Sequence, residues 1–229
     1  MQSGQMKILA FDTSANSCSI CLKDGKKILS IYNEELARGQ AELLIPQIEI
    51  MLKKNSLVMK DIDLIAVCNG AGSFTGLRAS ISAARAFAIA LEKPVLGINS
   101  FEAYYKLLSE EEKSDYNVVI VESKREDFYY ALYDREGNEL KEPQAQYFDD
   151  IMSVISDNKI SVIGDGADRF IEAGENLDIF YKKNEDYPNV EMIADIAYEK
   201  YMDNKEAIDK DIRKYFPSPL YIRAPYTCK

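Results

Sequence analysis

The pattern of apolar and polar positions divides the first hundred residues into strands and helices. Short apolar or alternating runs, typical of strands, occupy residues 7–14, 18–25, 26–35, 61–68 and 94–98. Helical spacing of the apolar positions covers residues 40–54 and 75–91. Asp24-Gly25 predicts a hairpin turn between the second and third strands. Three antiparallel strands followed by helix, strand, helix and strand predict an α/β lobe with a mixed sheet.

The second half of the chain begins with the same pattern. The run NVVIVES is a buried strand ending in an acidic residue and a hydroxyl, and FYYALYDREGNEL adds a strand, a charged Gly turn and another strand. Glu122 stands 122 − 12 = 110 residues after Asp12. A repeat of that length predicts two related lobes, residues 6–107 and 116–229, joined by a charged linker. The proline-containing C-terminal segment is expected to lie extended across the surface.

The composition removes several classes of chemistry. The 229 residues include no histidine, which excludes a Ser-His-Asp or Cys-His nucleophile and a His-ligated metal within this chain. The formal net charge of −10 opposes tight, non-specific binding of a phosphate backbone. No signal peptide and no run of 18 apolar residues is present, so a cytoplasmic protein with no membrane partner is expected.

The four cysteines do not predict a redox or metal site. Cys18 and Cys21 form a C-x-x-C pair, but they lie in an alternating, strand-like run whose geometry sends positions i and i+3 to opposite faces. A redox pair is typically placed at a helix N-terminus instead. Cys18, Cys21, Cys68 and Cys228 are therefore expected to be ordinary small residues, with no disulfide framework and no cofactor.

The Gly-rich stretch NGAGSFTGLR, residues 69–78, separates the strand at 61–68 from the helix at 75–91. It matches neither the Walker loop, which needs a lysine after the last glycine, nor the dinucleotide fingerprint, which needs glycine at Thr75. A helix N-terminus still attracts anions, and Ser73 or Thr75 is placed to cap it. The stretch is therefore either a weak anion site or a tight turn that lets two surfaces approach closely.

The helix that follows this turn has two apolar stripes, whereas a helix that covers one sheet needs only one. The first stripe consists of small residues, Ala79, Ala83, Ala86 and Ala90. The second consists of Leu77, Ile81, Ala84, Ala88 and Leu91. Two interpretations remain open: the helix is wholly internal to its lobe, or one stripe is covered by a second chain.

Two lobes, each opening with a strand, an acidic residue and a hairpin, resemble the two-lobed α/β fold of actin, hexokinase and Hsp70 (the ASKHA fold). More specifically, KILAFDTS, GSFTGLR, GINSFEAY and PSPLYIR together resemble the TsaB (YeaZ) family over nearly the whole chain. Ala71 stands where that family usually has proline, a mild departure. The resemblance implies mixed sheets and a reduced second lobe.

The TsaB family is the dimerisation subunit of the bacterial complex that makes threonylcarbamoyladenosine in tRNA. The resemblance implies a non-catalytic scaffold that pairs with the catalytic paralogue TsaD, recruits the ATPase TsaE and contacts tRNA only through the complex. The paralogue's metal-binding Asn-His-x-x-x-His segment corresponds here to Asn99, Ser100 and Tyr104, so both histidine positions are lost. A homodimer is expected when the chain is alone.

Two groups of site residues follow from the resemblance. The interface with a partner is expected to include Leu44, Ile48, Phe74, Leu77, Arg78, Ile81, Ala83, Arg85 and Phe87. A vestigial nucleotide-binding site is expected at Asp12, Thr13, Ser14, Gly164 and Gly166, with simple turn residues as the alternative. No catalytic residue and no metal ligand is expected.

The main rival function belongs to a different class. A nucleotide-dependent small-molecule kinase or ATPase of the same superfold would use Asp12 as a metal carboxylate and residues 164–166 around the nucleotide. Its second acidic position, Glu122, is followed by Ser-Lys-Arg, and the second lobe looks trimmed. A peptidase lacks any nucleophile, base and metal set in this chain.

Overall fold

A computed structural model describes residues 5–36, 38–155, 159–174, 180–181 and 189–223. The chain divides into two compact units. Met1–Asn99 and Pro188–Pro219 form the first lobe, and Ser100–Tyr187 and Leu220–Lys229 form the second. None of the helices in the described ranges is long and apolar enough to cross a membrane.

The first lobe is built on a mixed sheet of five strands in the order β3-β2-β1-β4-β5. Its strands are β1 (Lys7–Asp12), β2 (Ser17–Asp24), β3 (Lys27–Glu35), β4 (Leu64–Gly70) and β5 (Val95–Asn99). The first three are antiparallel neighbours, β4 pairs in parallel with β1, and β5 pairs in parallel with β4. The predicted succession of elements and the mixed sheet are therefore confirmed, including the tight turn at Gly25, whose φ is 58°.

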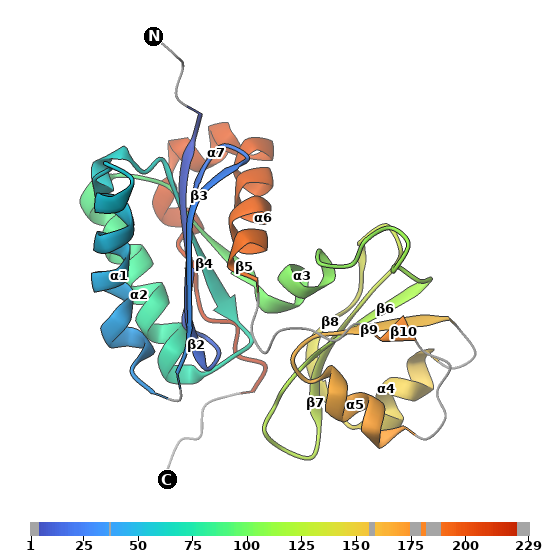
Figure 1. Ribbon diagram of the computed structural model, residues 1–229. Coiled ribbons are helices and arrows are strands. Elements are labelled where there is room, and N and C mark those ends of the chain that lie inside the picture. Colours follow the sequence, from blue (N-terminus) through green and yellow to red (C-terminus); the bar gives the residue numbers. More distant parts are fainter. Residues whose placement is uncertain (1–4, 37, 156–158, 175–179, 182–188, 224–229) are drawn as a thin grey trace. The chain divides into compact units, whose positions relative to one another are not determined.

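Helices cover both faces of this sheet (Figure 1). One face carries α1 (Gln40–Lys54) and α2 (Phe74–Leu91), and the other carries α6 (Val190–Asp203), which is followed by α7 (Lys205–Lys210) and η2 (Ile212–Tyr215). The short helix η1 (Met59–Asp61) precedes β4 in the chain, and its Met59 packs on the core beneath α1 and α2. Because both faces are covered, the interior strand β2 is buried along nearly its whole length. Cys18 and Cys21 are buried and free, as the alternation predicted, whereas Cys228 lies outside the described residues.

The second lobe repeats the first sheet with five strands in the order β10-β9-β6-β7-β8. Its strands are β6 (Tyr116–Val121), β7 (Phe128–Tyr133), β8 (Glu139–Gln146), β9 (Ile160–Ile163) and β10 (Phe180–Tyr181). Its helices are α3 (Ser100–Tyr105), α4 (Phe148–Ile155) and α5 (Ala167–Ala173). The antiparallel meander β6-β7-β8 corresponds to β1-β2-β3, and the parallel neighbour β9 corresponds to β4, so the predicted repeat is confirmed.

The predicted lobe boundaries differ from this division. The second lobe begins at Ser100 rather than after residue 107, and residues 188–219 belong to the first lobe although the sequence assigned them to the second. The physical reason is the packing of α6, which contacts β1, β2, β4 and β5 and closes the second face of the first sheet. Ile193, Ala194 and Ala197 of this helix are fully buried.

A buried ion pair anchors α6 to the sheet. The Lys23 side chain is 3% exposed, and its Nζ lies 2.5 Å from Asp195 Oδ1 and 3.9 Å from Glu191 Oε1 of α6. Lysine is rarely buried unless an acidic partner compensates the loss of hydration. These contacts therefore fix the registry between β2 and α6.

Replacing Asp195 with alanine is expected to lower the free energy of unfolding by about 2 kcal/mol, because it removes the nearest acidic partner of the buried Lys23 ammonium. Adding Lys23→Met should recover most of that loss, since no charge then remains to be compensated. Urea denaturation of the two variants measures both effects. Glu49→Ala serves as the control, because its pair with Lys53 is 65% and 73% exposed and should contribute little. Equal losses in Asp195→Ala and Glu49→Ala would contradict the anchoring role.

Candidate functional site

The turn after β1 is closed by the Gly-rich loop that begins α2. Thr13 Oγ1 donates a hydrogen bond to the carbonyl of Gly76 at 2.8 Å, and the Ser73 amide donates to the carbonyl of Ser14 at 2.6 Å. Asp12, Thr13 and Ser14 are all buried. The Ser73 side chain caps α2 by accepting from the Gly76 amide at 3.5 Å, so of the two predicted capping residues it is Ser73 that caps the helix.

Two glycines of the loop are required by this close approach. A Cβ on Gly76 would lie 1.8 Å from the carbonyl oxygen of Thr13, and one on Gly72 would lie 2.6 Å from that of Ser14. Any side chain at either position would force the loop away from the turn. The glycines of NGAGSFTGLR therefore allow two backbone segments to meet, which answers the alternative left open by the sequence in favour of a tight turn.

Asp12 is a carboxylate held inside this closed turn. Its Oδ1 accepts the Ser14 amide at 2.7 Å, whereas Oδ2 is buried and has no hydrogen-bond partner among the described residues. Burial raises the pKa of Asp12 from 3.8 to about 6, against smaller opposing effects of the hydrogen bonds from Ser14. The Ser14 hydroxyl also contacts the Cys68 sulfur at 3.5 Å. Asp12 is thus a buried acid with only one of its two oxygens hydrogen-bonded, and the first turn of α2 packs against the turn that holds it.

The corresponding acid of the second lobe is neutralised by an arginine. Arg169 of α5 donates from Nε and a terminal nitrogen to the two Glu122 oxygens, at 2.9 and 3.0 Å, and its guanidinium lies over the Phe128 ring. This bidentate geometry is the strong form of an arginine–carboxylate contact. Glu122 is therefore committed to an internal ion pair.

The Gly-Asp-Gly turn packs directly on β6. Gly164 has a φ of 121°, and a Cβ there would lie 2.0 Å from the Ile120 carbonyl oxygen; one on Gly166 would lie 2.9 Å from the Ile120 side chain. Asp165 Oδ1 accepts the Glu122 amide at 2.9 Å. The glycines are explained by this packing, which is the simple-turn alternative stated for Gly164 and Gly166.

Comparison with known proteins gives a consistent family. A family model described as TsaD, tRNA N6-adenosine threonylcarbamoyltransferase, matches residues 30–226. The tRNA threonylcarbamoyladenosine biosynthesis protein TsaB of Buchnera aphidicola subsp. Baizongia pistaciae is 27% identical over 218 residues, which are 91% of this chain and 96% of that protein. The solved structure of YeaZ from Pseudomonas aeruginosa superposes with a TM-score of 0.78 at 19% identity, covering 95% of this chain and 100% of that one. The chain belongs to the TsaB (YeaZ) family.

The match to another relative is shorter. The TsaB protein of Buchnera aphidicola subsp. Schizaphis graminum is 29% identical over 126 residues, which span 55% of this chain and 60% of that protein.

The fold predicted from the sequence, two α/β lobes of the ASKHA type, is confirmed for this TsaB-family chain. Ser100 and Tyr104, the positions at which the resemblance led us to expect the paralogue's histidines, are both fully buried on α3.

The predicted interface residues of this TsaB-family chain fall into two groups. Four are buried in the core between the helices and the first sheet, which corrects their assignment to a partner surface: Leu44, Ile48, Leu77 and Ile81. The hydrophobic pattern identified their apolar face correctly, but that face points into the lobe. The others reach the surface to some degree: Phe74 and Arg78 are exposed, and Ala83, Arg85 and Phe87 are half-buried.

The exposed face of these helices also carries residues that the sequence analysis missed. Ile89 on α2 is 57% exposed, and Ile45 and Ile50 on α1 are 46% and 42% exposed. On α2, Phe74, Arg78, Ser82, Ala86 and Ile89 follow one another at intervals of three or four residues and are all exposed. This spacing is visible in the sequence, but its mixture of aromatic, charged, polar and apolar residues does not stand out as an apolar stripe.

Arg85 has an intramolecular role that the sequence did not predict. Its Nε donates to the Pro217 carbonyl at 2.8 Å, and a terminal nitrogen donates to the Ser218 hydroxyl at 3.2 Å. Asn69 donates to the Ser218 carbonyl at 3.1 Å. The C-terminal segment is therefore held against α2 and β4, and Arg85 is engaged within its own lobe.

Proposed function

We propose that this chain is a non-catalytic scaffold subunit in the biosynthesis of threonylcarbamoyladenosine in tRNA, acting in the cytoplasm. It pairs with the catalytic paralogue TsaD, recruits the ATPase TsaE and forms a homodimer when alone. The proposal rests on family membership, because relatives along the chain carry the name of this pathway. The observation that carries the non-catalytic part is the closed turn at Asp12, where the loop that starts α2 is bonded to Thr13 and Ser14.

The second acidic position supports the same conclusion over the rival kinase or ATPase. Such an enzyme would hold its metal and phosphates with free carboxylates near glycine turns. Here Glu122 is bound by Arg169, and the turn at Gly164 and Gly166 is filled by the backbone of β6. These contacts favour a structural role for both acidic positions.

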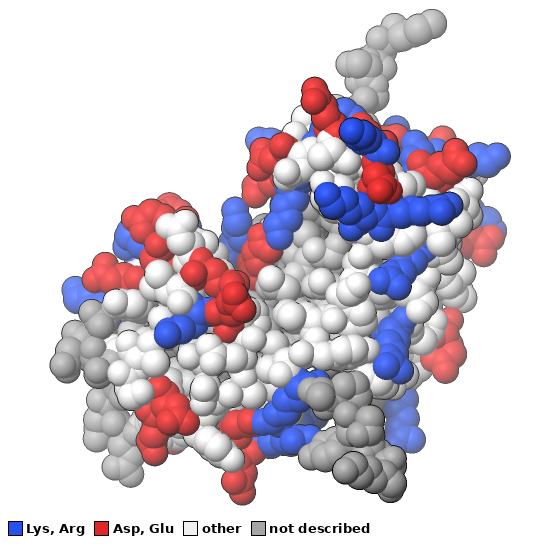
Figure 2. All heavy atoms as spheres, turned by 180° about the vertical axis from the view of Figure 1, so that it is seen from behind, with Lys and Arg blue, Asp and Glu red and all other residues white. Residues whose placement is uncertain are grey.

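The outer face of α2 is the surface that we assign to the partner. It presents Phe74 and Ile89 at its two ends, with small residues between them and Arg78 lying 3.6 Å over the Phe74 ring centre. Small residues let another helix approach closely, and the two large apolar side chains provide the area that association buries. Contact with tRNA is assigned to the complex, because the formal net charge of −10 opposes binding of a phosphate backbone by this chain alone, although the face shown in Figure 2 carries basic as well as acidic side chains.

Replacing Ile89 with glutamate is expected to turn a dimer into a folded monomer and to weaken capture of the catalytic paralogue by about tenfold or more, because a charge replaces a buried apolar contact. Light scattering after size exclusion gives the mass, and a pull-down with purified paralogue gives the capture. The matched control is Ile31→Glu on the edge strand β3 of the same lobe, where the isoleucine is 49% exposed. Ala83 is less suitable, because it is half-buried and packs on the core.

Three results would contradict the proposal. If the wild type is a monomer and does not bind the paralogue, the chain has no such interface. If Ile89→Glu and Ile31→Glu have equal effects, the interface is not on the outer face of α2. Stoichiometric nucleotide binding with turnover by the purified chain would favour the kinase or ATPase instead. In that case Asp12→Asn should abolish the turnover.

A further inference from the structure

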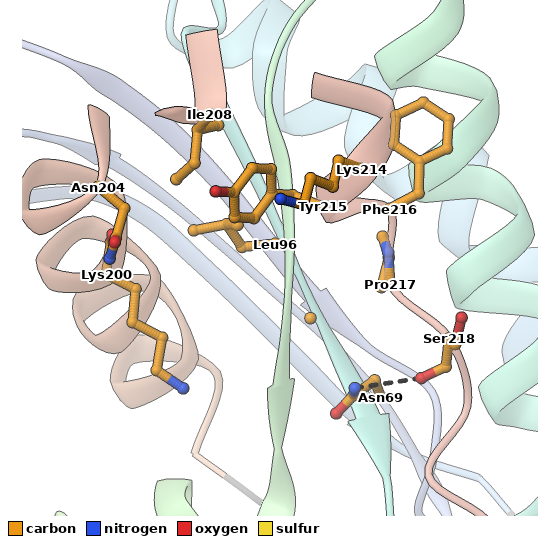
Figure 3. A pocket seen from close by; sticks show the side chains of 11 residues that line it. Asn69, Leu96, Lys200, Asn204, Ile208, Lys214, Tyr215, Phe216, Pro217 and Ser218 are labelled. Atoms are coloured by element: carbon orange, nitrogen blue, oxygen red, sulfur yellow. Dashed lines mark hydrogen bonds between the residues drawn. The ribbon is translucent and has the colours of Figure 1, made fainter. Parts of the chain in front are cut away.

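A groove in the first lobe lies between α6 and the C-terminal segment, beside the edge strand β5. Its volume is about 540 Å³. In Figure 3, Lys200 of α6 and Asn204, the residue that follows this helix, lie on one side, and residues 214–218 form the other side, with Leu96 of β5 between them. The volume is within the range of roughly 300–1,000 Å³ that small-molecule sites occupy.

The wall made by the C-terminal segment is fixed by specific contacts. Asn69 and Arg85 donate to the carbonyls of Ser218 and Pro217, as described above. Gly97 of β5 allows Pro217 to pack closely, because a Cβ on Gly97 would lie 2.8 Å from the Pro217 side chain. On this side, the wall of the groove is therefore a backbone segment held in place by hydrogen bonds.

One polar atom of the lining lacks a partner. The side-chain nitrogen of Asn69 is bonded to Ser218, but its oxygen, Oδ1, is buried and accepts no hydrogen bond from the described residues. A buried acceptor without a donor is unfavourable, because it has lost its hydrogen bonds to water and gained none in the protein. An N–H or O–H group of a bound molecule would satisfy it.

The charge of the lining is opposite to that of the chain. Lys200 and Lys214 line the groove from its two sides, and none of its lining residues is acidic, although the whole chain has a formal net charge of −10. The ammonium group of an exposed lysine such as Lys214 attracts a carboxylate or a phosphate in such a setting. Tyr215 and Leu96 supply an aromatic and an aliphatic surface beside them.

We propose that this groove binds a small anion that also carries a hydrogen-bond donor. The carboxylate or phosphate contacts Lys214, the donor is accepted by Asn69 Oδ1, and the less polar part lies on Tyr215 and Leu96. This site is separate from the outer face of α2 assigned to the partner protein. The proposal also stands apart from the proposed function, since it requires only the folded first lobe.

The test is a titration of the isotope-labelled full chain, followed by the NMR shifts of the Gly97 amide and the Asn69 side-chain amide. The probes are 5′-AMP, which offers a phosphate, N-acetylphenylalanine, which offers a carboxylate and an amide N–H, and neutral adenosine. Saturable binding of one or both anions, with shifts at these two residues and none with adenosine, is expected. The anion that binds more tightly shows whether the groove prefers a phosphate or a carboxylate.

Two charge reversals distinguish a built site from general attraction. Lys214→Glu should weaken binding by about tenfold or more, as expected when a charge-assisted hydrogen bond is replaced by repulsion. Lys210→Glu, which makes the same change of net charge at an exposed lysine outside the groove, should alter binding less than about twofold. Equal weakening by both variants, binding of adenosine as tight as that of 5′-AMP, or no saturable binding of either anion would overturn the proposal.

Discussion

Replacing Gly76 with alanine is expected to destabilise the first lobe by about 3 kcal/mol, although alanine favours a helix over glycine by about 1 kcal/mol. The added Cβ would lie 1.8 Å from the Thr13 carbonyl oxygen, which is a backbone atom and cannot rotate away. Moving the loop breaks the bonds from Thr13 to Gly76 and from Ser73 to Ser14 as well. Urea unfolding measures the loss.

The control for this variant is Thr75→Ala, one residue earlier in the same helix turn, where the side chain is exposed. Its free energy of unfolding should stay within about 0.5 kcal/mol of the wild type. A Gly76→Ala protein as stable as this control would show that the loop does not need to contact the Asp12 turn. The argument for a closed turn would then fail.

Replacing Asp12 with asparagine is expected to stabilise the protein by about 3 kcal/mol at pH 8, because the ionised carboxylate is buried at a cost. The pKa of Asp12 is about 6 in the folded chain and 3.8 when unperturbed. Between these values the folded chain retains a proton that the unfolded chain releases, so the wild type loses stability as the pH rises from about 4 to about 6. Above that pH the penalty is constant.

The difference between Asp12→Asn and the wild type should therefore grow across this interval and level off above it. Asparagine retains the oxygen that accepts the Ser14 amide. Thermal unfolding at pH 4, 5, 6, 7 and 8 gives the profile, and Asp203→Asn, at an exposed acid, gives the baseline. A pH-independent difference would contradict the raised pKa, and a loss of stability at pH 8 would show that the carboxylate is compensated by a contact other than those seen.

Local chemistry was sufficient to predict the sheets. The succession of strands and helices follows from apolar runs separated by strong turn residues such as Asp24-Gly25. The repeat follows from two acids, Asp12 at the end of β1 and Glu122 directly after β6. These features act over a few residues, so their outcome is readable in the chain. The same holds for the cap at Ser73.

The errors concern contacts between residues that are distant in sequence. Nothing near Asp195 indicates that its partner is Lys23, which lies 172 residues earlier, so α6 was assigned to the wrong lobe. Amphipathic spacing shows that Leu44 and Leu77 share an apolar face with their neighbours, but it does not show whether the sheet or a second chain covers that face. The role of Arg85 depends on where the C-terminal segment returns.

The late position of α6 has a consequence for synthesis of the protein on the ribosome. All five strands of the first sheet have been made by Asn99, but the helix that covers one face begins at Val190. At a rate of synthesis of roughly 5–20 residues per second, that face of the sheet stays uncovered for about 5–20 s until α6 has been made. During this time, the nascent chain presents an apolar sheet surface that a ribosome-associated chaperone would recognise, and the second lobe is being completed while the first is still open.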